Sequence, residues 1–225
     1  MIQVMILGFL FVGTHFWLSS AALRTPLVDR FGENGFLGVY SLVSAVTLVL
    51  LILAYGEASR VRYWWYPDPT QYAVAKVIMW FAVVLVAGSF LAPNPSSVGM
   101  GDKAKEGPHG MLRVTRHPLL LGVGLWGFAH IVANGDLVSV VFFSWFVVLA
   151  VLGALLLDAK KGQQLGSDWH NFSAQTSLLP FRAILAGRTK LVVAELVAPV
   201  VVGSLVYGLL FWAHEWLSGV ELTLF

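Results

Sequence analysis

Residues 113–136 read RVTRHPLLLGVGLWGFAHIVANGD and predict a membrane helix together with the turn that ends it. The apolar run Pro118–Ala133 is typical of a helix, because proline is well tolerated in a first helical turn, where its missing N–H is not needed. In the turn that follows, Gly135 suits the left-handed residue that closes a helix and Asp136 suits the N-cap of the next one. The apolar run Leu137–Leu157 comes next, so we expect two antiparallel neighbouring helices.

The composition extends this pattern to the whole chain. Of its 225 residues, 58% are hydrophobic and 12% are charged, and the mean hydropathy is +0.78, far from the usage of globular proteins. Long uncharged runs also differ from the short alternating strands of a membrane barrel. We therefore expect one all-α, polytopic transmembrane domain over residues 1–225, with short amphipathic pieces on the membrane surface between residues 158 and 190. The six expected spans are Ile2–Leu23, Phe36–Tyr55, Tyr72–Ala92, Pro118–Ala133, Leu137–Leu157 and Leu191–Trp216.

The distribution of basic residues predicts the orientation. The connections after the first, third and fifth spans contain eleven Lys and Arg, whereas the other side has only Arg60 and Arg62. Since cytoplasmic loops carry the excess of basic residues, both termini should lie on the opposite, periplasmic side. No Lys or Arg precedes the first apolar run, so we expect it to stay as a helix rather than be cleaved as a signal peptide. The lipid bilayer is the expected partner, and no pattern indicates nucleic-acid binding.

Two histidines inside the spans are the candidate metal ligands. His15 lies in the first span and His130 in the fourth, one turn after Trp126, at depths of about 12 and about 18 Å from the cytoplasmic boundary. The chain has no Cys, which excludes thiolate ligation and covalent haem attachment. An imidazole in a membrane needs a hydrogen-bond partner or a metal, and haem b accepts two imidazoles. Spacing alone favours hydrogen bonds between helices over haem ligation as the role of these two histidines. His214 is an alternative candidate for one of the two haem ligands.

Basic residues precede the fourth span. Arg113, Arg116 and His117 could bind an anionic group at a helix N-terminus, such as a haem propionate, a lipid phosphate or a substrate carboxylate, or could serve as an ordinary membrane anchor. Glu195, near the start of the last span, could be a proton relay, but we expect it to pair with Lys190.

Three glycines in the fourth span, Gly122, Gly124 and Gly127, spell G-x-G-x-x-G. In a soluble protein this spacing would suggest a dinucleotide site, but that site needs a preceding strand. None is expected here. The glycines therefore predict close packing between membrane helices, or room for a flat ligand against the backbone.

The chain resembles the NnrU family of bacterial membrane proteins, which is associated with denitrification and related to the 15-cis-zeta-carotene isomerases of plants and cyanobacteria. The resemblance rests on His15 with the following SSAALR, on GENGFLGVYSL from Gly32, on TRHPLLLGVGLWGFAHIVANGD, and on residues 169–181. It implies a haem b held non-covalently by two histidines, at positions that match His15 and His130. It also implies a redox-active protein of the bacterial inner membrane that accompanies nitrite and nitric oxide reduction, with a nitric oxide reductase system as a partner.

Other functions remain open. The isomerases imply haem-dependent cis-trans isomerisation of a carotenoid-like polyene, in which reduction of the iron frees one ligand, although SSAALRTPL and NGD follow NnrU more closely. RHP at a helix start and GSDWHNF before LLPF resemble the S-adenosylmethionine-dependent isoprenylcysteine methyltransferases. Those enzymes follow RHP with a tyrosine and carry paired glutamates, where this chain has Leu119, Leu120 and only Asp158. A non-catalytic assembly or haem-handling protein is the third possibility.

Overall fold

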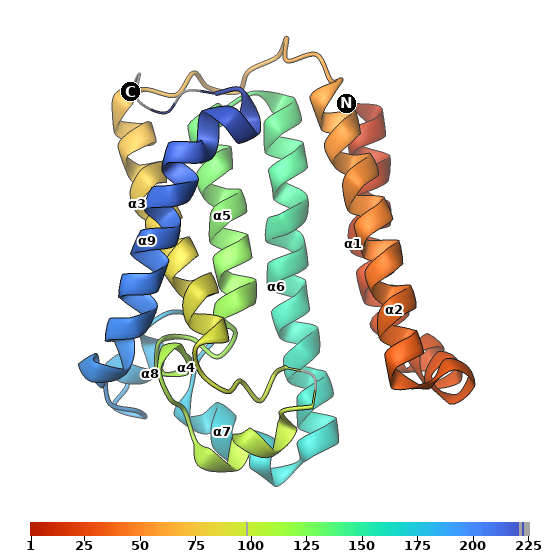
Figure 1. Cartoon of the computed structure of the whole chain (residues 1–225), viewed down its shortest axis with the longest axis vertical. Coiled ribbons are helices and arrows are strands. Elements are labelled where there is room, and N and C mark those ends of the chain that lie inside the picture. Colours follow the sequence, from red (N-terminus) through yellow and green to blue (C-terminus); the bar gives the residue numbers. More distant parts are fainter. Residues whose placement is uncertain (98, 221, 223–225) are drawn as a thin grey trace.

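The computed structural model of the chain is a bundle of helices (Figure 1), and it describes residues 1–97, 99–220 and 222. Within these residues there is no β-strand, as the sequence predicts. The helices are α1 (Ile2–Ser19), α2 (Ala21–Gly56), α3 (Pro69–Phe90), the 3-10 helix η1 (Gly101–Glu106), α4 (Met111–Val114), α5 (Pro118–Asn134), α6 (Leu137–Leu165), α7 (Ser167–Gln175), α8 (Arg182–Leu185) and α9 (Val193–Ser218).

The long helices are the membrane spans. Five of them, α1, α2, α3, α6 and α9, are long and apolar enough to cross a bilayer, and α5 is a shorter apolar helix of 17 residues. At 1.5 Å per residue α5 is about 26 Å long, close to the roughly 30 Å of a hydrocarbon core. The chain is an all-α polytopic membrane protein, and these helices agree with the expected count of about six spans.

The connection between the first two spans differs from the expectation. Helix α1 ends at Ser19, four residues early, because Ser20 is extended (φ −65°, ψ 147°). Helix α2 then kinks at Gly32 (φ 72°, ψ 169°), a conformation that glycine adopts without steric cost. Residues 21–31 therefore form a short separate helix before the second span. An ion pair between Arg24 and Glu33 (2.5 Å) joins the two sides of the kink.

The turn between α5 and α6 has the predicted geometry. Gly135 closes α5 in the left-handed conformation (φ 71°), and the Asp136 carboxylate caps α6 by accepting a hydrogen bond from the Ser139 N–H (2.9 Å). Helix α6 continues to Leu165, two turns beyond the predicted end of the span. Asp158 consequently lies on a continuous helix and not in a broken polar segment.

The spans pack in the order α9, α3, α5, α6, α1, α2, so α6 stands between α5 and the α1–α2 hairpin (Figure 1). Two of the glycines of α5 allow close contact with its neighbours. A Cβ at Gly122 would lie 2.8 Å from the Ala82 carbonyl oxygen of α3, and one at Gly127 would lie 2.9 Å from the Phe143 carbonyl oxygen of α6. The interpretation of G-x-G-x-x-G as a packing motif is therefore confirmed.

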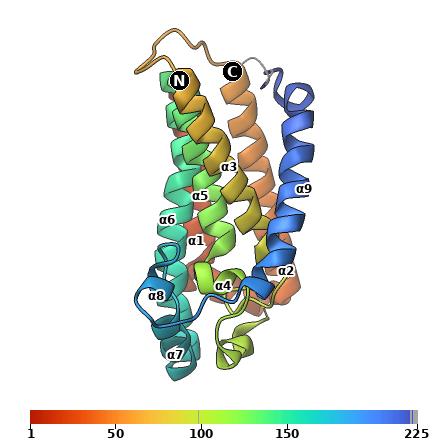
Figure 2. The same cartoon turned by 90° about the vertical axis from the view of Figure 1, so that its left-hand side faces the viewer.

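The short helices η1, α4, α7 and α8 gather at one end of the bundle, which we call the loop end, and the N-terminus and the end of α9 lie at the other (Figures 1 and 2). Backbone hydrogen bonds tie the segment after α7 to the residues before α5: Arg116 N–H donates to Ser177 (2.8 Å), and Phe181 N–H donates to Val114 (2.9 Å). Two sequence-distant segments are thereby fixed beside each other under α5 and α6.

Candidate functional site

The two span histidines have the same local geometry. The Nδ1–H of His15 donates to the Phe11 carbonyl (2.6 Å), and the Nδ1–H of His130 donates to the Trp126 carbonyl (2.9 Å), each one turn earlier in its own helix. In both rings Nε2 has no hydrogen-bond partner among the described residues. A backbone carbonyl at one ring nitrogen fixes the tautomer that leaves the other nitrogen as a ligand.

Aromatic side chains connect the two histidines. Phe146 of α6 contacts Phe11 on one side (ring centroids 5.6 Å apart) and Trp126 on the other (5.1 Å). Phe11 in turn contacts His15 (4.5 Å), and Trp126 contacts His130 (4.7 Å). The two imidazoles therefore belong to one aromatic cluster, which runs from α1 across Phe146 of α6 to α5.

The α1–α6 interface also contains an unused donor. The indole N–H of Trp145 is buried with no hydrogen-bond partner in the described part of the chain. Its ring lies against Gly8, where a Cβ would come within 2.0 Å of the indole. A buried indole N–H ordinarily has a hydrogen-bond acceptor, so the Trp145 N–H can donate a hydrogen bond to an acceptor atom of a bound group. Two imidazoles with free Nε2 atoms, apolar aromatic walls and a spare donor fit the donor chemistry of haem b.

His214, the rival ligand, lies near the end of α9. Its Nδ1–H donates to the Val220 carbonyl (2.9 Å), outside its own helix. Ser218 Oγ also lies 3.0 Å from this Nδ1, so the contacts of His214 are those of a helix end. These contacts do not exclude it as a rival partner for His130.

At the loop end, Asp158 organises the RHP segment. Its carboxylate accepts two hydrogen bonds from the Arg116 guanidinium (2.9 and 2.5 Å) and one from His117 Nε2 (2.7 Å). Ser96 Oγ lies 3.1 Å from His117 Nδ1, and Thr176 Oγ1 lies 3.1 Å from Arg116 Nη1. Arg116 and His117 are 8% and 3% exposed, so these buried groups are held and neutralised within the protein.

Arg113 is also paired. Its guanidinium donates to both carboxylate oxygens of Glu195 (2.7 and 3.1 Å), and Glu195 accepts a further hydrogen bond from the Gly110 N–H (2.7 Å). The expected pairing of Glu195 with Lys190 is therefore wrong: Glu195 points toward α4, and only the Lys190 backbone carbonyl takes part, near Arg113. This contact joins α9 to the residues before α5.

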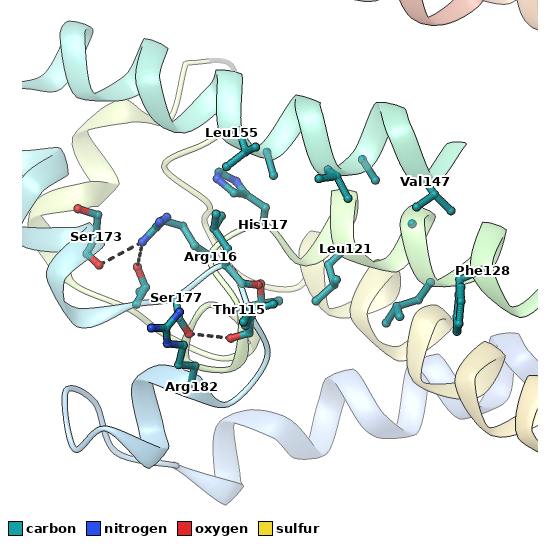
Figure 3. A pocket seen from close by; sticks show the side chains of 18 of the residues that line it. Thr115, Arg116, His117, Leu121, Phe128, Val147, Leu155, Ser173, Ser177 and Arg182 are labelled. Carbon is teal, nitrogen blue, oxygen red and sulfur yellow. Dashed lines mark hydrogen bonds between the residues drawn. The ribbon is translucent and has the colours of Figure 1, made fainter. Parts of the chain in front are cut away.

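A cavity of about 780 Å³ opens where the RHP segment, α5, α6 and the segment after α7 meet (Figure 3). Figure 3 shows polar side chains, among them Arg116, Ser177 and Arg182, at one end and Phe128 and Val147 toward the other. Trp126 and the span histidines do not line it. The predicted site residues therefore fall into two places: the aromatic cluster with His15, His130 and Trp126, and the loop end with the basic group.

Sequence reasoning missed two contributors to the loop end. Asp158 follows a long apolar run, and the sequence places it in a broken surface segment, although a carboxylate next to a membrane is itself a sign of a paired group. Arg182 lies 66 residues after Arg116, and only the fold brings it to the same cavity.

The fold and these sites define a polytopic helical membrane protein with an imidazole in each of two spans and an ion-paired loop end. The chain belongs to the NnrU family: the family model described as "NnrU protein" matches residues 4–222.

Two chloroplastic 15-cis-zeta-carotene isomerases are similar to the chain. The one from Zea mays is 31% identical over 119 residues, which is 51% of this chain and 32% of that protein. The one from Arabidopsis thaliana is 32% identical over 79 residues, which is 35% of this chain and 22% of that protein. The chain thus spans about a third or less of the length of these relatives, and no solved structure matches it.

Proposed function

We propose that this chain is a redox-active haem b-binding protein that holds haem non-covalently through His15 and His130. The observation that carries the proposal is that each span imidazole has Nδ1 occupied by a carbonyl of its own helix and Nε2 without a partner among the described residues. Metal-ligating histidines are commonly oriented in this way. When bound, haem b supplies a one-electron redox centre. Membership of the NnrU family supports a role beside nitrite and nitric oxide reduction in the bacterial inner membrane.

The chain's own residues have distinct parts in this proposal. Phe146 and Trp126 provide the apolar walls that exclude water from the cofactor. The indole N–H of Trp145 can donate a hydrogen bond to an acceptor atom at the edge of the cofactor. Arg113 and Arg116 could receive an anionic group only in competition with their carboxylate partners, Glu195 and Asp158. We therefore assign the basic group to positioning α5.

Haem content tests this proposal. The full chain is expressed with added haem precursor, purified in detergent and assayed for non-covalently bound haem b. We expect about one extractable haem per chain, because both imidazoles would be used to hold a single haem. Protein that is folded, as judged by circular dichroism, and free of haem under these conditions contradicts the proposal.

Isomerisation of a polyene is a second candidate, favoured by the similarity to the zeta-carotene isomerases. The same two imidazoles would hold the haem in that case, and the haem would supply the reactive centre. The discriminating assay incubates reduced and oxidised protein with a cis-polyene in detergent and separates the isomers by chromatography. Conversion by the reduced form alone supports an isomerase, and no conversion by either form supports an electron-transfer or accessory role.

A methyltransferase is the third candidate, because the RHP segment and the segment after α7 meet at the loop-end cavity. Against it, Arg116 and His117 are both held by Asp158. Calorimetry with S-adenosylmethionine separates this candidate from the others, since saturable binding would support the methyltransferase.

A further inference from the structure

The loop-end cavity contains none of the residues proposed to hold haem. Its volume of about 780 Å³ lies within the range of about 300–1,000 Å³ that is usual for small-molecule sites. It is formed by α5 and α6 along the membrane and by residues 173–188 at the loop end. A site of this size with a polar end and an apolar end needs an occupant with the same two parts.

The polar end of the cavity has excess positive charge. No Asp or Glu is among the described residues that line it. Arg116 is neutralised by Asp158, but the Arg182 side chain has no carboxylate partner in the described part of the chain, and Arg188 donates only to the Ala174 carbonyl (3.0 Å). Two exposed guanidinium groups are therefore available to an anion, for which arginine is well suited.

The apolar end is a groove between α5 and α6. Leu121 and Phe128 of α5 line it, and seven residues at 1.5 Å each give a length of about 10 Å. Phe128 and Val151 are 47% and 55% exposed, so the groove opens sideways toward the lipid. Close contact between α5 and α6 closes its floor, because a Cβ at Gly124 would lie 3.0 Å from the Ala150 Cβ. A groove with apolar walls that is open to lipid on one side suits a hydrocarbon chain.

We propose that this cavity binds an amphiphile with a single anionic head group and one apolar chain, which enters sideways from the membrane. The head group lies at Arg182 and Arg188, and the chain lies between α5 and α6 along Phe128 and Val151. A neutral polyene lacks the anion that the polar end requires.

Photoaffinity labelling tests the proposal with the full chain in phosphatidylcholine nanodiscs. The probe is palmitate with a diazirine at its terminal carbon, and labelled peptides are located by mass spectrometry. We expect labelling on residues 121–128 and 147–155. The double variant Arg182→Gln, Arg188→Gln should lower it about tenfold, because it removes both charge-assisted contacts. The exposed Lys190, which does not line the cavity, provides the control variant Lys190→Gln, with unchanged labelling.

A second pair of variants tests the position of the chain. Val151→Trp fills the groove from its lipid-facing side and should abolish labelling, whereas Val46→Trp, at an exposed position of α2, should leave it unchanged. Both sites tolerate a larger side chain because they face lipid.

Four results overturn the proposal. Equal labelling by the methyl ester of the probe would show that the cavity does not recognise the carboxylate. Labelling of the double arginine variant at the wild-type level would show that Arg182 and Arg188 do not bind the carboxylate. Equal labelling by a diazirine phosphatidylglycerol would mean that a membrane phospholipid is the occupant. Displacement of the probe by S-adenosylmethionine would mean that the cavity belongs to a methyltransferase.

Discussion

His15 and His130 are distinguished from the other histidines by a shared geometry: Nδ1 donates to a carbonyl one turn earlier in the same span, and Nε2 has no partner in the described part of the chain. Both are partly buried in spans and fixed through Nδ1 by their own helix. His117, by contrast, has both nitrogens engaged, by Ser96 and Asp158. An imidazole with one free ring nitrogen in an apolar setting can bind a metal through that nitrogen. An imidazole with both nitrogens hydrogen-bonded has a structural role.

The first prediction concerns ligand identity. His130→Ala and His15→Ala should each abolish the haem absorption of a bis-histidine centre, because each removes one of two ligands. His214→Ala is the matched control, since its ring is held by Val220 and Ser218 at a helix end. The absorption spectrum of each purified variant is the measurement. Loss of haem in His214→Ala with retention in His15→Ala would show that His130 pairs with His214.

The second prediction concerns Asp158. Asp158→Asn keeps the side chain's size but leaves the Arg116 guanidinium, which is 8% exposed, without its counter-charge. Removing one partner of a buried ion pair is costly, and we expect a loss of about 2–4 kcal/mol in the free energy of unfolding. Thermal unfolding in detergent, followed by circular dichroism, measures it.

The control is an exposed ion pair at the same end of the bundle. Glu106 pairs with Lys103 at 2.7 Å, but their side chains are 51% and 43% exposed. Glu106→Gln should therefore change the stability by less than about 0.5 kcal/mol. Similar losses in Glu106→Gln and Asp158→Asn would contradict a central role for the Asp158 network.

At the scale of elements, α5 is the helix through which the bundle is assembled. It packs against both α3 and α6. Gly122 allows the close approach of α5 to α3, and Gly127 allows the close approach of α5 to α6. The sequence predicted this helix, its capping turn and its packing face, because proline, glycine and aspartate act locally. The sequence also placed a turn at Gly32–Gly35 before the second span, and the helix breaks at Gly32. It did not predict the end of α1 at Ser19, because the apolar run continues past the extended Ser20 to Leu23.

The third prediction tests this packing. Gly122→Ala places a methyl group 2.8 Å from the Ala82 carbonyl oxygen, so α3 and α5 must separate, at a cost of about 1–3 kcal/mol. Gly208→Ala is the control, because a Cβ there meets nothing within 4 Å. A lower unfolding temperature for Gly122→Ala and an unchanged or higher one for Gly208→Ala are expected. Equal temperatures would rule out close α3–α5 packing at this position.

At the scale of the whole molecule, the alternation of connections follows the predicted topology. The N-terminus, the end of α9 and the α2–α3 and α5–α6 turns lie at one end, and the loop end carries most basic residues (Figures 1 and 2). The positive-inside rule assigns the loop end to the cytoplasm, which stays a prediction.

The fourth prediction tests that assignment and uses the absence of Cys from the sequence. Ser59→Cys lies in the α2–α3 connection and Ser167→Cys at the start of α7, and both positions are exposed. A membrane-impermeant maleimide should label Ser59→Cys in intact spheroplasts and Ser167→Cys only after permeabilisation. The reverse labelling pattern would contradict the prediction and show that the loop end faces the periplasm.

The candidate site was less predictable than the fold. His15, His130 and Trp126 could be selected from sequence because polar groups in apolar spans are costly and therefore conspicuous. The pairing of Arg113 with Glu195 and of Arg116 with Asp158 could not be, because each joins helices far apart in the chain. The contacts of Phe146 with both Phe11 and Trp126 depend on the rotation of α6, which its uniformly apolar sequence leaves undetermined.

In the proposed function, His15 and His130 hold a redox-active haem b. The most direct measurement is a reduced-minus-oxidised difference spectrum of the detergent-purified full chain, expressed with ample haem. We expect a b-type spectrum with the sharp bands that are typical of a haem held by two histidines. A folded protein that stays colourless under these conditions would contradict it.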